Sequence, residues 1–305
     1  MMDATPRKPV CDYDGSHYQT EFWEKGGRAY EDLVERISLR HLLPKNGALC
    51  LEIGAGAGRL TRELDRFERV VLLDYSRTQL QQAQERLGRG PRFIYVVANV
   101  YHLPFVPGLF HTALMVRVIH HLVDPRAALE GVRATLRPSG ALVLEFANKR
   151  NVKAILRYWF GRQSWNPFSP ESIEFSKLNF NFCPRSMRSW LHEAGFTIRK
   201  QRSISHFRIP LLKRIVPLHW LATADGVLQS SGEFWQLSPS LMLRADAHPV
   251  GPIAPTQSFF RCQHCYSTEL SESENTITCP NCGPVCRISD GIYDFKEPFS
   301  SQRSK

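Results

Sequence analysis

The feature that most constrains the fold is a series of five short apolar segments in the first half of the chain. Each is rich in branched aliphatic residues, and its apolarity is nearly continuous rather than alternating. The segments are residues 48–53, 69–75, 92–97, 111–116 and 140–147. Such continuity predicts strands that are buried on both faces, as in a parallel sheet.

Helix-like patterns separate these segments, at residues 58–66, 76–87 and 125–137. Ser76 stands where a helix N-cap is expected, and Asp124 followed by Pro125 is typical of a helix start. The alternation of strand and helix predicts βαβ units and therefore an α/β fold with a doubly wound, Rossmann-like sheet.

The second half is less regular at first and then regains the pattern. We expect a helix over 186–196 that ends at Gly195, followed by a strand over 197–204. A last strand is expected over 239–246, and the proline-rich stretch 247–258 is interpreted as a linker.

A glycine-rich turn, "LEIGAGAGRL" at residues 51–60, follows the first predicted strand. The dinucleotide-binding fingerprint GxGxxG fits at Gly54 and Gly56, but Arg59 occupies its third glycine position and the third glycine is Gly58. Asp74 ends the second predicted strand, where a carboxylate can accept hydrogen bonds from ribose hydroxyls. The turn alone is a moderate indication of a nucleotide-like ligand.

Further motifs follow in order: "ANVYHLPF" (98–105), "RVIHHLVDP" (117–125) and "LRPSGALVL" (136–144). Together with the glycine turn and Asp74, they resemble the class I S-adenosylmethionine-dependent methyltransferases, and most closely the group that includes the ubiquinone/menaquinone C-methyltransferases. The resemblance covers about residues 45–200. It implies a seven-stranded sheet whose last strand is antiparallel, and transfer of a methyl group from S-adenosylmethionine to an acceptor.

The resemblance also implies a cofactor site. Its expected residues are Glu52, Gly54, Ala55, Gly56, Gly58, Asp74, Tyr75, Asn99 and Val100. Glycines lack a β-carbon and so allow the backbone to approach the ligand closely. Glu52 would supply negative charge near the cationic end of the cofactor. Asn99 stands where the family usually has an aspartate, and its side-chain oxygen can still accept from an adenine amine. His111 likewise replaces a usual aspartate.

Candidate catalytic residues lie just after the fourth predicted strand: His120, His121 and Arg117. A general base is needed only if the acceptor must lose its proton early, and histidine titrates near neutral pH. Each of these histidines could instead pack or cap locally.

Residues 148–183 follow the fifth predicted strand and are rich in aromatic side chains. Ligands of open α/β sheets lie beyond the carboxyl ends of the strands. We therefore expect this segment to form an aromatic cap over the acceptor pocket, suited to an apolar or planar acceptor. The alternative is that the rings form only the core of an inserted helical unit.

Five of the eight cysteines lie in the last fifth of the chain. Cys262, Cys265, Cys279 and Cys282 form two CxxC pairs, a spacing that predicts a structural zinc site. The closing "CRISDGIYDF" (286–295) resembles the end of the small zinc-ribbon proteins that activate methyltransferases. The predicted organisation is a methyltransferase domain over 1–246, with its core at about 36–210, then the linker, a zinc ribbon over 259–298 and a disordered tail over 299–305.

The net charge is +10, and six basic residues without an acidic one lie between Phe196 and Val216. Two functions stay open. One is methylation of an unidentified small or lipidic molecule. The other is methylation of RNA, or of an RNA-linked protein, with the zinc ribbon as a docking surface for RNA or a partner protein. A cofactor-sensing adaptor without activity is a third, weaker alternative.

The sequence predicts a cytoplasmic protein. Metal-type cysteine spacing is typical of a reducing compartment, and neither a secretory signal nor a transmembrane segment is expected. The most apolar long stretch, Ile209–Ala224, contains Lys213, Arg214 and two prolines. We expect it to contribute to the core rather than to lie on a lipid surface.

Overall fold

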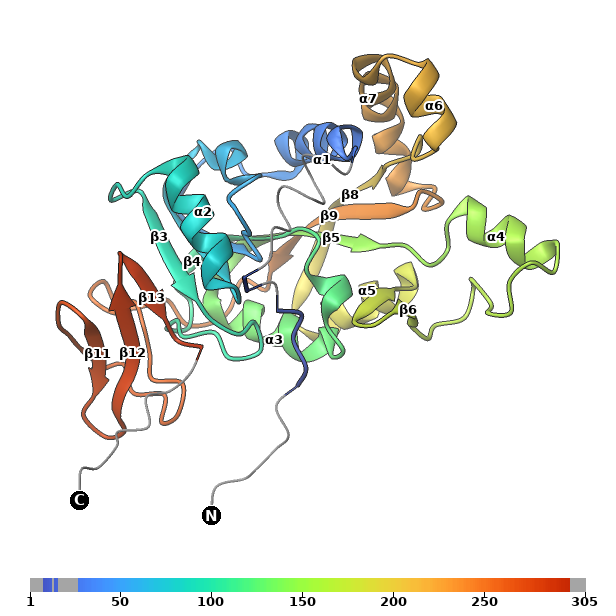
Figure 1. Ribbon diagram of the computed structural model, residues 1–305. Coiled ribbons are helices and arrows are strands. Elements are labelled where there is room, and N and C mark those ends of the chain that lie inside the picture. Colours follow the sequence, from blue (N-terminus) through green and yellow to red (C-terminus); the bar gives the residue numbers. More distant parts are fainter. Residues whose placement is uncertain (1–7, 13, 16–26, 297–305) are drawn as a thin grey trace.

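The computed structural model describes residues 8–12, 14–15 and 27–296, and its centre is a twisted sheet (Figure 1). Seven of its strands form the order β3-β2-β1-β4-β5-β9-β8. In chain order they are β1 (Gly47–Ile53), β2 (Phe67–Asp74), β3 (Phe93–Val97), β4 (Phe110–Met115), β5 (Leu136–Ala147), β8 (Phe196–Ile204) and β9 (Ser240–Ala247). The first five pair in parallel, and β9 runs antiparallel to both β5 and β8. The predicted α/β class, the seven core strands and the antiparallel last strand are confirmed.

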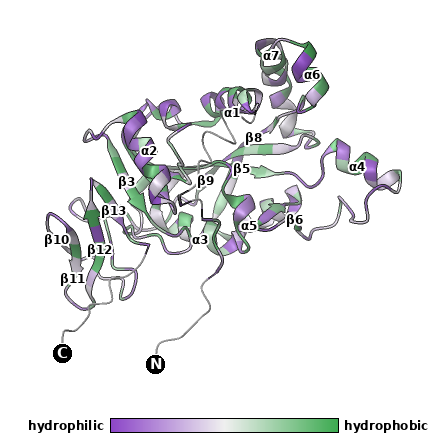
Figure 2. Ribbon diagram, viewed as in Figure 1, coloured by the Kyte–Doolittle hydropathy of each residue, from purple (hydrophilic) through white to green (hydrophobic). Residues whose placement is uncertain are grey.

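The strands are buried on both faces, as their continuous apolarity predicts. Leu49 and Leu51 belong to one hydrophobic cluster, whereas Cys50, between them, belongs to the cluster on the opposite face. Figure 2 shows hydrophobic residues throughout the central strands.

Helices cover the sheet at α1 (Ala29–Leu42), α2 (Arg77–Leu87), α3 (Pro125–Thr135) and α5 (Pro184–Glu193). Both predicted caps form: Ser76 Oγ accepts from the N–H of Gln79, and Asp124 Oδ1 accepts from the N–H of Ala127. The helix expected over 58–66 is wrong, because only a single 3₁₀ turn, η2 (Thr61–Leu64), forms there. The three glycines that precede it all have positive φ, a conformation that does not continue into an α-helix.

The cysteine-rich segment extends the edge of the sheet. It forms β10 (Ser271–Glu272), β11 (Thr276–Cys279), β12 (Gly283–Ser289) and β13 (Ile292–Asp294), and β13 pairs in parallel with β3 to give one sheet of eleven strands. On the side of α2, Arg77 donates to the carbonyl and hydroxyl oxygens of Ser289 at 3.0 and 2.6 Å. Strand pairing and side-chain contacts therefore join this segment to the core.

The predicted linker, 247–258, crosses the outside of α3. Arg133 donates to the carbonyls of His248 and Val250, and the N–H of Ala254 donates to the carbonyl of Gly108. The tail predicted over 299–305 lies outside the described residues, as does the start of the chain up to residue 7. The domain boundaries stay predictions.

Two smaller units project from the sheet beyond β5 and β8 (Figure 1). One contains α4 (Val152–Trp159) and the hairpin β6 (Ile173–Ser176) and β7 (Asn179–Asn181). The other contains α6 (Pro210–Ile215), α7 (Leu218–Leu228) and η4 (Gln229–Glu233). No described helix is both long and apolar enough to cross a bilayer.

The stretch Ile209–Ala224 packs with one face only. Leu221 and Ala222 contact Tyr30 and Val34 in a small core of their own. On the other face, the side chains of Leu211, Ile215 and Trp220 are 64–68% exposed. The expectation of a core segment therefore holds for the face that carries Leu221 and Ala222, whereas Leu211, Ile215 and Trp220 form an apolar surface in contact with solvent.

The β13–β3 junction should contribute to global stability, because Ile292 is fully buried against the core cluster that includes Tyr95. We expect Ile292→Ala to lower the free energy of unfolding by about 2–5 kcal/mol, the usual cost of such a cavity. Urea denaturation monitored by circular dichroism measures this. The matched control is Ile253→Ala, at a linker side chain that is 63% exposed, and it should change stability little. Equal stability of the two variants would show that the junction is loose.

Candidate functional site

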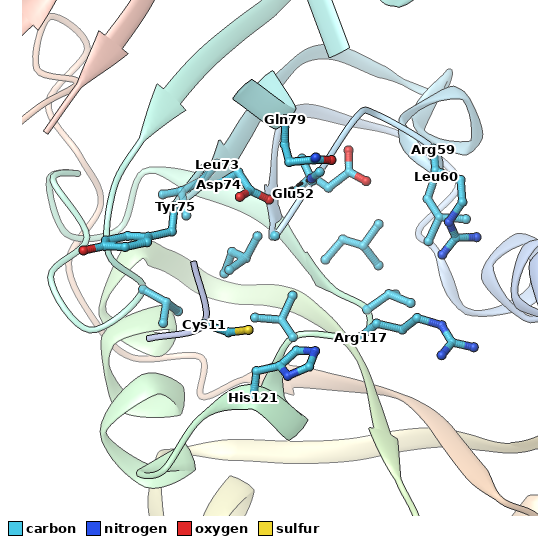
Figure 3. A pocket seen from close by; sticks show the side chains of 18 of the residues that line it. Cys11, Glu52, Arg59, Leu60, Leu73, Asp74, Tyr75, Gln79, Arg117 and His121 are labelled. Carbon is cyan, nitrogen blue, oxygen red and sulfur yellow. Dashed lines mark hydrogen bonds between the residues drawn. The ribbon is translucent and has the colours of Figure 1, made fainter. Parts of the chain in front are cut away.

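A pocket lies at the carboxyl ends of β1, β2 and β4, where the sequence predicts one (Figure 3). Of the predicted cofactor residues, seven line it: Glu52, Gly54, Ala55, Gly56, Asp74, Tyr75 and Val100. Of the predicted catalytic residues, Arg117 and His121 line it. Gly58, Asn99 and His120 lie outside the described lining.

The glycine turn ties the end of β1 to the end of β2. The N–H groups of Gly54 and Ala55 both donate to the carbonyl of Leu73, at 2.7 and 3.1 Å. Gly54 has φ +68°, and a β-carbon there would lie 2.1 Å from a methyl carbon of Val118. The turn therefore requires glycine at this position for both backbone and steric reasons.

Gly56 and Gly58 differ in their surroundings. A β-carbon on Gly56 would meet nothing closer than 3.8 Å, so this glycine leaves its space to the pocket. A β-carbon on Gly58 would lie 2.8 Å from Leu87 of α2. In the structure, Gly58 allows the turn to pack against a helix, and its predicted contact with the cofactor stays a prediction.

Glu52 is a buried carboxylate at the pocket. Its Oε2 accepts from the hydroxyl of Thr61 at 2.6 Å. Burial raises the pKa of Glu52 to about 7, an effect that the Thr61 hydrogen bond and the charge of Arg59 only partly offset. A cationic ligand group would offset the cost of ionising this buried carboxyl group.

Asp74 lies on the same side of the pocket as Glu52 (Figure 3). Its Oδ2 accepts from the N–H of Gly56 at 2.8 Å, and its Oδ1 accepts from the N–H of Ser76 at 2.9 Å. Burial raises the pKa of Asp74. Because an ionised carboxylate has about four lone-pair sites, two backbone bonds leave room for a pair of ligand hydroxyls.

Asn99 caps its own loop, since its Oδ1 accepts from the N–H of Tyr101 at 2.9 Å. Val100, the next residue, is buried and lines the pocket. The loop therefore presents an apolar contact to the pocket, and the predicted role of Asn99 is not tested by its position.

Arg117 is held in an unusual conformation at the opposite side of the pocket. It has φ +58°, its N–H donates to Glu145 at 3.0 Å, and its Nε donates to the buried Glu35 at 2.6 Å. Arg59 donates to the other oxygen of Glu35 at 2.6 Å. A left-handed conformation at a residue other than glycine costs free energy and is concentrated at functional sites.

His120 and His121 lie in the 3₁₀ turn η3 (Ile119–His121), with ring centroids 4.3 Å apart. Nδ1 of His121 is 2.8 Å from the carbonyl of Leu178, which fixes this nitrogen as the protonated one. Burial lowers the pKa of His121, so the ring is neutral near pH 7. Burial also lowers the pKa of His120 strongly, and the buried Nδ1 of His120 has no hydrogen-bond partner among the described atoms.

The aromatic segment 148–183 contributes no described residue to the lining of this pocket. Its contact with the site is indirect, through the carbonyl of Leu178 on His121. Residues that sequence reasoning missed are Val10 and Cys11, which line the pocket from the N-terminal segment. This segment is tied down by Asp14, which accepts from the hydroxyl of Thr78 at 2.8 Å, and by Asp12, which pairs with Lys296 at 2.7 Å. Nothing in the sequence around residue 10 indicates this placement.

The four predicted metal ligands converge in the cysteine-rich segment. The sulfur atoms of Cys262, Cys265, Cys279 and Cys282 all lie within 4.8 Å of one another, which fits the tetrahedral four-thiolate set that zinc prefers. Cys286 is buried in β12 and is not part of the group.

Part of the chain is similar to known methyltransferases. Residues 51–144 match the profile of a methyltransferase domain family. Over 130 residues the chain is 32% identical to a ubiquinone/menaquinone biosynthesis C-methyltransferase of Hahella chejuensis, covering 39% of this chain and 52% of that protein. A demethylmenaquinone methyltransferase of Clavibacter sepedonicus is 23% identical over 198 residues, covering 61% of this chain and 81% of that protein. The chain spans between a third and about half of the length of the first curated relatives that it matches.

Solved structures show the same fold. A chain from a complex of the Haloferax volcanii Trm112 methyltransferase activator superposes with a TM-score of 0.54 at 16% identity, covering 76% of this chain and 96% of that one. An S-adenosylmethionine-dependent methyltransferase from Mesorhizobium loti gives 0.51 at 19% identity, covering 72% of this chain and all of that one. The resemblance to the class I methyltransferases is thus confirmed.

Proposed function

We propose that this chain, which carries a class I methyltransferase domain, transfers the methyl group of S-adenosylmethionine to a small or lipidic acceptor. The observation that supports this most directly is the convergence of Glu52, Asp74 and Gly56 in one pocket inside the matched domain. The two carboxylates fit a ligand that has a cationic end and a ribose, and the glycine lets the protein backbone approach that ligand closely.

The residues take the following roles. Asp74 would accept from both ribose hydroxyls, and the buried Glu52 would face the cationic end of the cofactor. Val100 would pack against the adenine ring, and Gly56 would let the protein backbone approach the cofactor closely. When bound, S-adenosylmethionine supplies an activated methyl group, so alignment of the acceptor accounts for much of the rate.

His121 is the strongest candidate for a general base. With Nδ1 protonated and bound to Leu178, Nε2 carries the lone pair, and the lowered pKa keeps the ring neutral at pH 7. Arg117, held by Glu35, would orient an acceptor of negative charge. His120 would support the position of the His121 ring against which it packs.

Several contacts favour a small or lipidic acceptor over RNA. Much of the basic charge that would bind phosphate is already paired: Lys213 with Glu31 at 2.8 Å, and Arg199 with Asp246 at 3.0 Å. Lys149 is buried and donates to Ser169 and to the carbonyl of Glu171. The quinone-methyltransferase relatives point the same way. RNA stays the alternative.

We further propose that Cys262, Cys265, Cys279 and Cys282 bind structural zinc. The ribbon would do within this chain what a separate activator protein does for its methyltransferase, because β13 of the ribbon pairs with β3 of the methyltransferase domain. Its partner would then be the chain's own methyltransferase domain rather than RNA or a second protein. A cytoplasmic location is kept as part of this proposal, since a four-thiolate zinc site requires reduced cysteines.

The decisive experiment uses purified protein and radiolabelled S-adenosylmethionine in a cell extract, fractionated into lipid, small molecules, RNA and protein. We expect label in the lipid or small-molecule fraction. Asp74→Ala should abolish both the label and the calorimetric heat of cofactor binding, whereas Asp65→Ala, at an exposed position, should change neither. Label in RNA alone would support the alternative, and absence of binding heat with folded protein would refute the proposal.

The raised pKa of Glu52 predicts a pH dependence of cofactor binding. Above about pH 7 the carboxylate is ionised and attracts the cation, whereas below pH 7 it must first release a proton. The dissociation constant should therefore rise up to about tenfold per pH unit between pH 7 and 5.5. Calorimetry over this range measures it. Glu52→Gln should bind more weakly at pH 7 and lose the dependence, while Glu85→Gln, at an exposed position, keeps it.

Zinc content provides a separate test. We expect one zinc per chain by mass spectrometry, and Cys279→Ser should lose the metal and lower the melting temperature, since metal binding contributes to folding. Cys286→Ser is the matched control, because Cys286 is also buried in the ribbon but lies outside the cluster. Retention of the metal in Cys279→Ser would contradict the assignment.

A further inference from the structure

A second and larger hollow lies outside the cofactor pocket, between the two projecting units. Its volume is about 880 Å³, within the range of small-molecule sites. We call it the lateral groove. One wall is α4, and the facing wall combines the segment 206–210 with the end of α7 and residues 231–239.

The walls of the lateral groove are mostly apolar. Val152, Leu156 and Phe160 line it from α4, and Ile209, Leu228 and Trp235 line it from the other side. Phe160 and Trp235 remain 73% and 71% exposed although they are large and apolar. Burying such side chains against an apolar ligand removes a large area from water and is therefore favourable.

The charge of the lateral groove has one sign. Lys153, Arg157, Arg162 and Arg208 are among its lining residues, and no aspartate or glutamate is among the described ones. A cleft lined by one sign of charge attracts ligands of the opposite sign. The groove therefore fits a ligand that is mostly apolar and carries a negative charge.

Arg208 connects the lateral groove with the cofactor pocket. It lines the groove, and its Nε lies 3.4 Å from Glu31. Arg117 of the cofactor pocket pairs with Glu35, which lies one turn from Glu31 on the same helix, α1. The inner end of the groove is therefore close to the Arg117 side of the cofactor pocket.

We propose that the lateral groove binds the acceptor's hydrocarbon chain and that the acceptor is a single anionic long-chain amphiphile, such as a fatty carboxylate. The chain lies between α4 and Trp235, and the acidic head lies toward Arg208. There a carboxylate oxygen would bond to the methyl carbon as the bond from that carbon to the sulfonium sulfur breaks, which gives a methyl ester and S-adenosylhomocysteine. Because the carboxylate is already ionised, this acceptor needs no general base. This inference rests on the proposed function for the role of the ligand as acceptor, but the binding itself does not depend on methyl transfer.

The test measures binding directly, with cis-parinarate, an anionic fluorescent fatty acid of eighteen carbons, below its micelle concentration. We expect saturable binding that oleate displaces and that octanoate and oleyl alcohol displace poorly. Leu156→Glu should weaken binding about tenfold or more, because it places a carboxylate in the apolar wall. The matched control Leu211→Glu, at an exposed residue of α6 outside the groove lining, should leave binding unchanged.

The charge requirement has its own pair of variants. Arg208→Gln should weaken parinarate binding about fivefold, since it removes the cation toward which the acidic head lies. Arg214→Gln, which changes the same type of residue outside the groove lining, should not. Circular dichroism confirms that each variant is folded.

The outcomes separate this inference from the proposed function. The inference would be overturned if parinarate showed no saturable binding, or if Leu156→Glu and Leu211→Glu weakened binding equally. It would also be overturned if oleyl alcohol displaced parinarate as well as oleate does, or if the protein bound phosphatidylglycerol vesicles but not monomeric parinarate. In any of these cases, cofactor binding and labelling of an extract would still support the methyltransferase. Parinarate binding without cofactor binding would retain the groove and reject the enzyme.

Discussion

The site depends on one backbone constraint, the left-handed turn that joins the end of β1 to the end of β2. Two N–H groups of the turn share the carbonyl of Leu73, and a third, that of Gly56, donates to Asp74. These bonds place the carboxylates of Glu52 and Asp74 in one pocket although they belong to different strands. Without glycine at residue 54, the turn would collide with Val118, and the turn could no longer hold the two carboxylates in one pocket.

The opposite side of the pocket depends on charge rather than on backbone. Glu35 of α1 is fully buried and pairs with both Arg59 and Arg117. A buried carboxylate with two cations is stable only when all partners are in place, because each uncompensated charge would be costly. This arrangement fixes Arg117 at the wall of the cofactor pocket.

The sequence predicted the parts of the fold that local pattern determines. The core strands were recognisable because both faces are buried, and Ser76 and Asp124 cap their helices through contacts within three residues. The cofactor residues could be placed since most of them lie at strand ends or in the turn. The 3₁₀ turn after Gly58 was missed, because the positive φ values at Gly54, Gly56 and Gly58 override the helical pattern that follows.

Contacts between distant segments could not be predicted. Three such contacts join residues that no local periodicity relates. They are the pairing of Arg117 with Glu35, the pairing of β13 with β3, and the placement of Cys11 at the pocket. The lateral groove was also missed, because α4, the 206–210 segment and Trp235 come together only in the folded chain. The aromatic segment was expected over the acceptor pocket, and its helix α4 lines the lateral groove.

The contact between Lys296 and Asp12 has a consequence for biosynthesis. Val10 and Cys11 reach the pocket from a segment that is anchored by a residue nearly three hundred positions later in the chain. During translation, the sheet can form while residue 296 is still inside the ribosome, but the segment above the pocket has no anchor at that side until the last strand has emerged. The cofactor site can therefore be completed only after residue 296 has emerged, later than the core of the sheet.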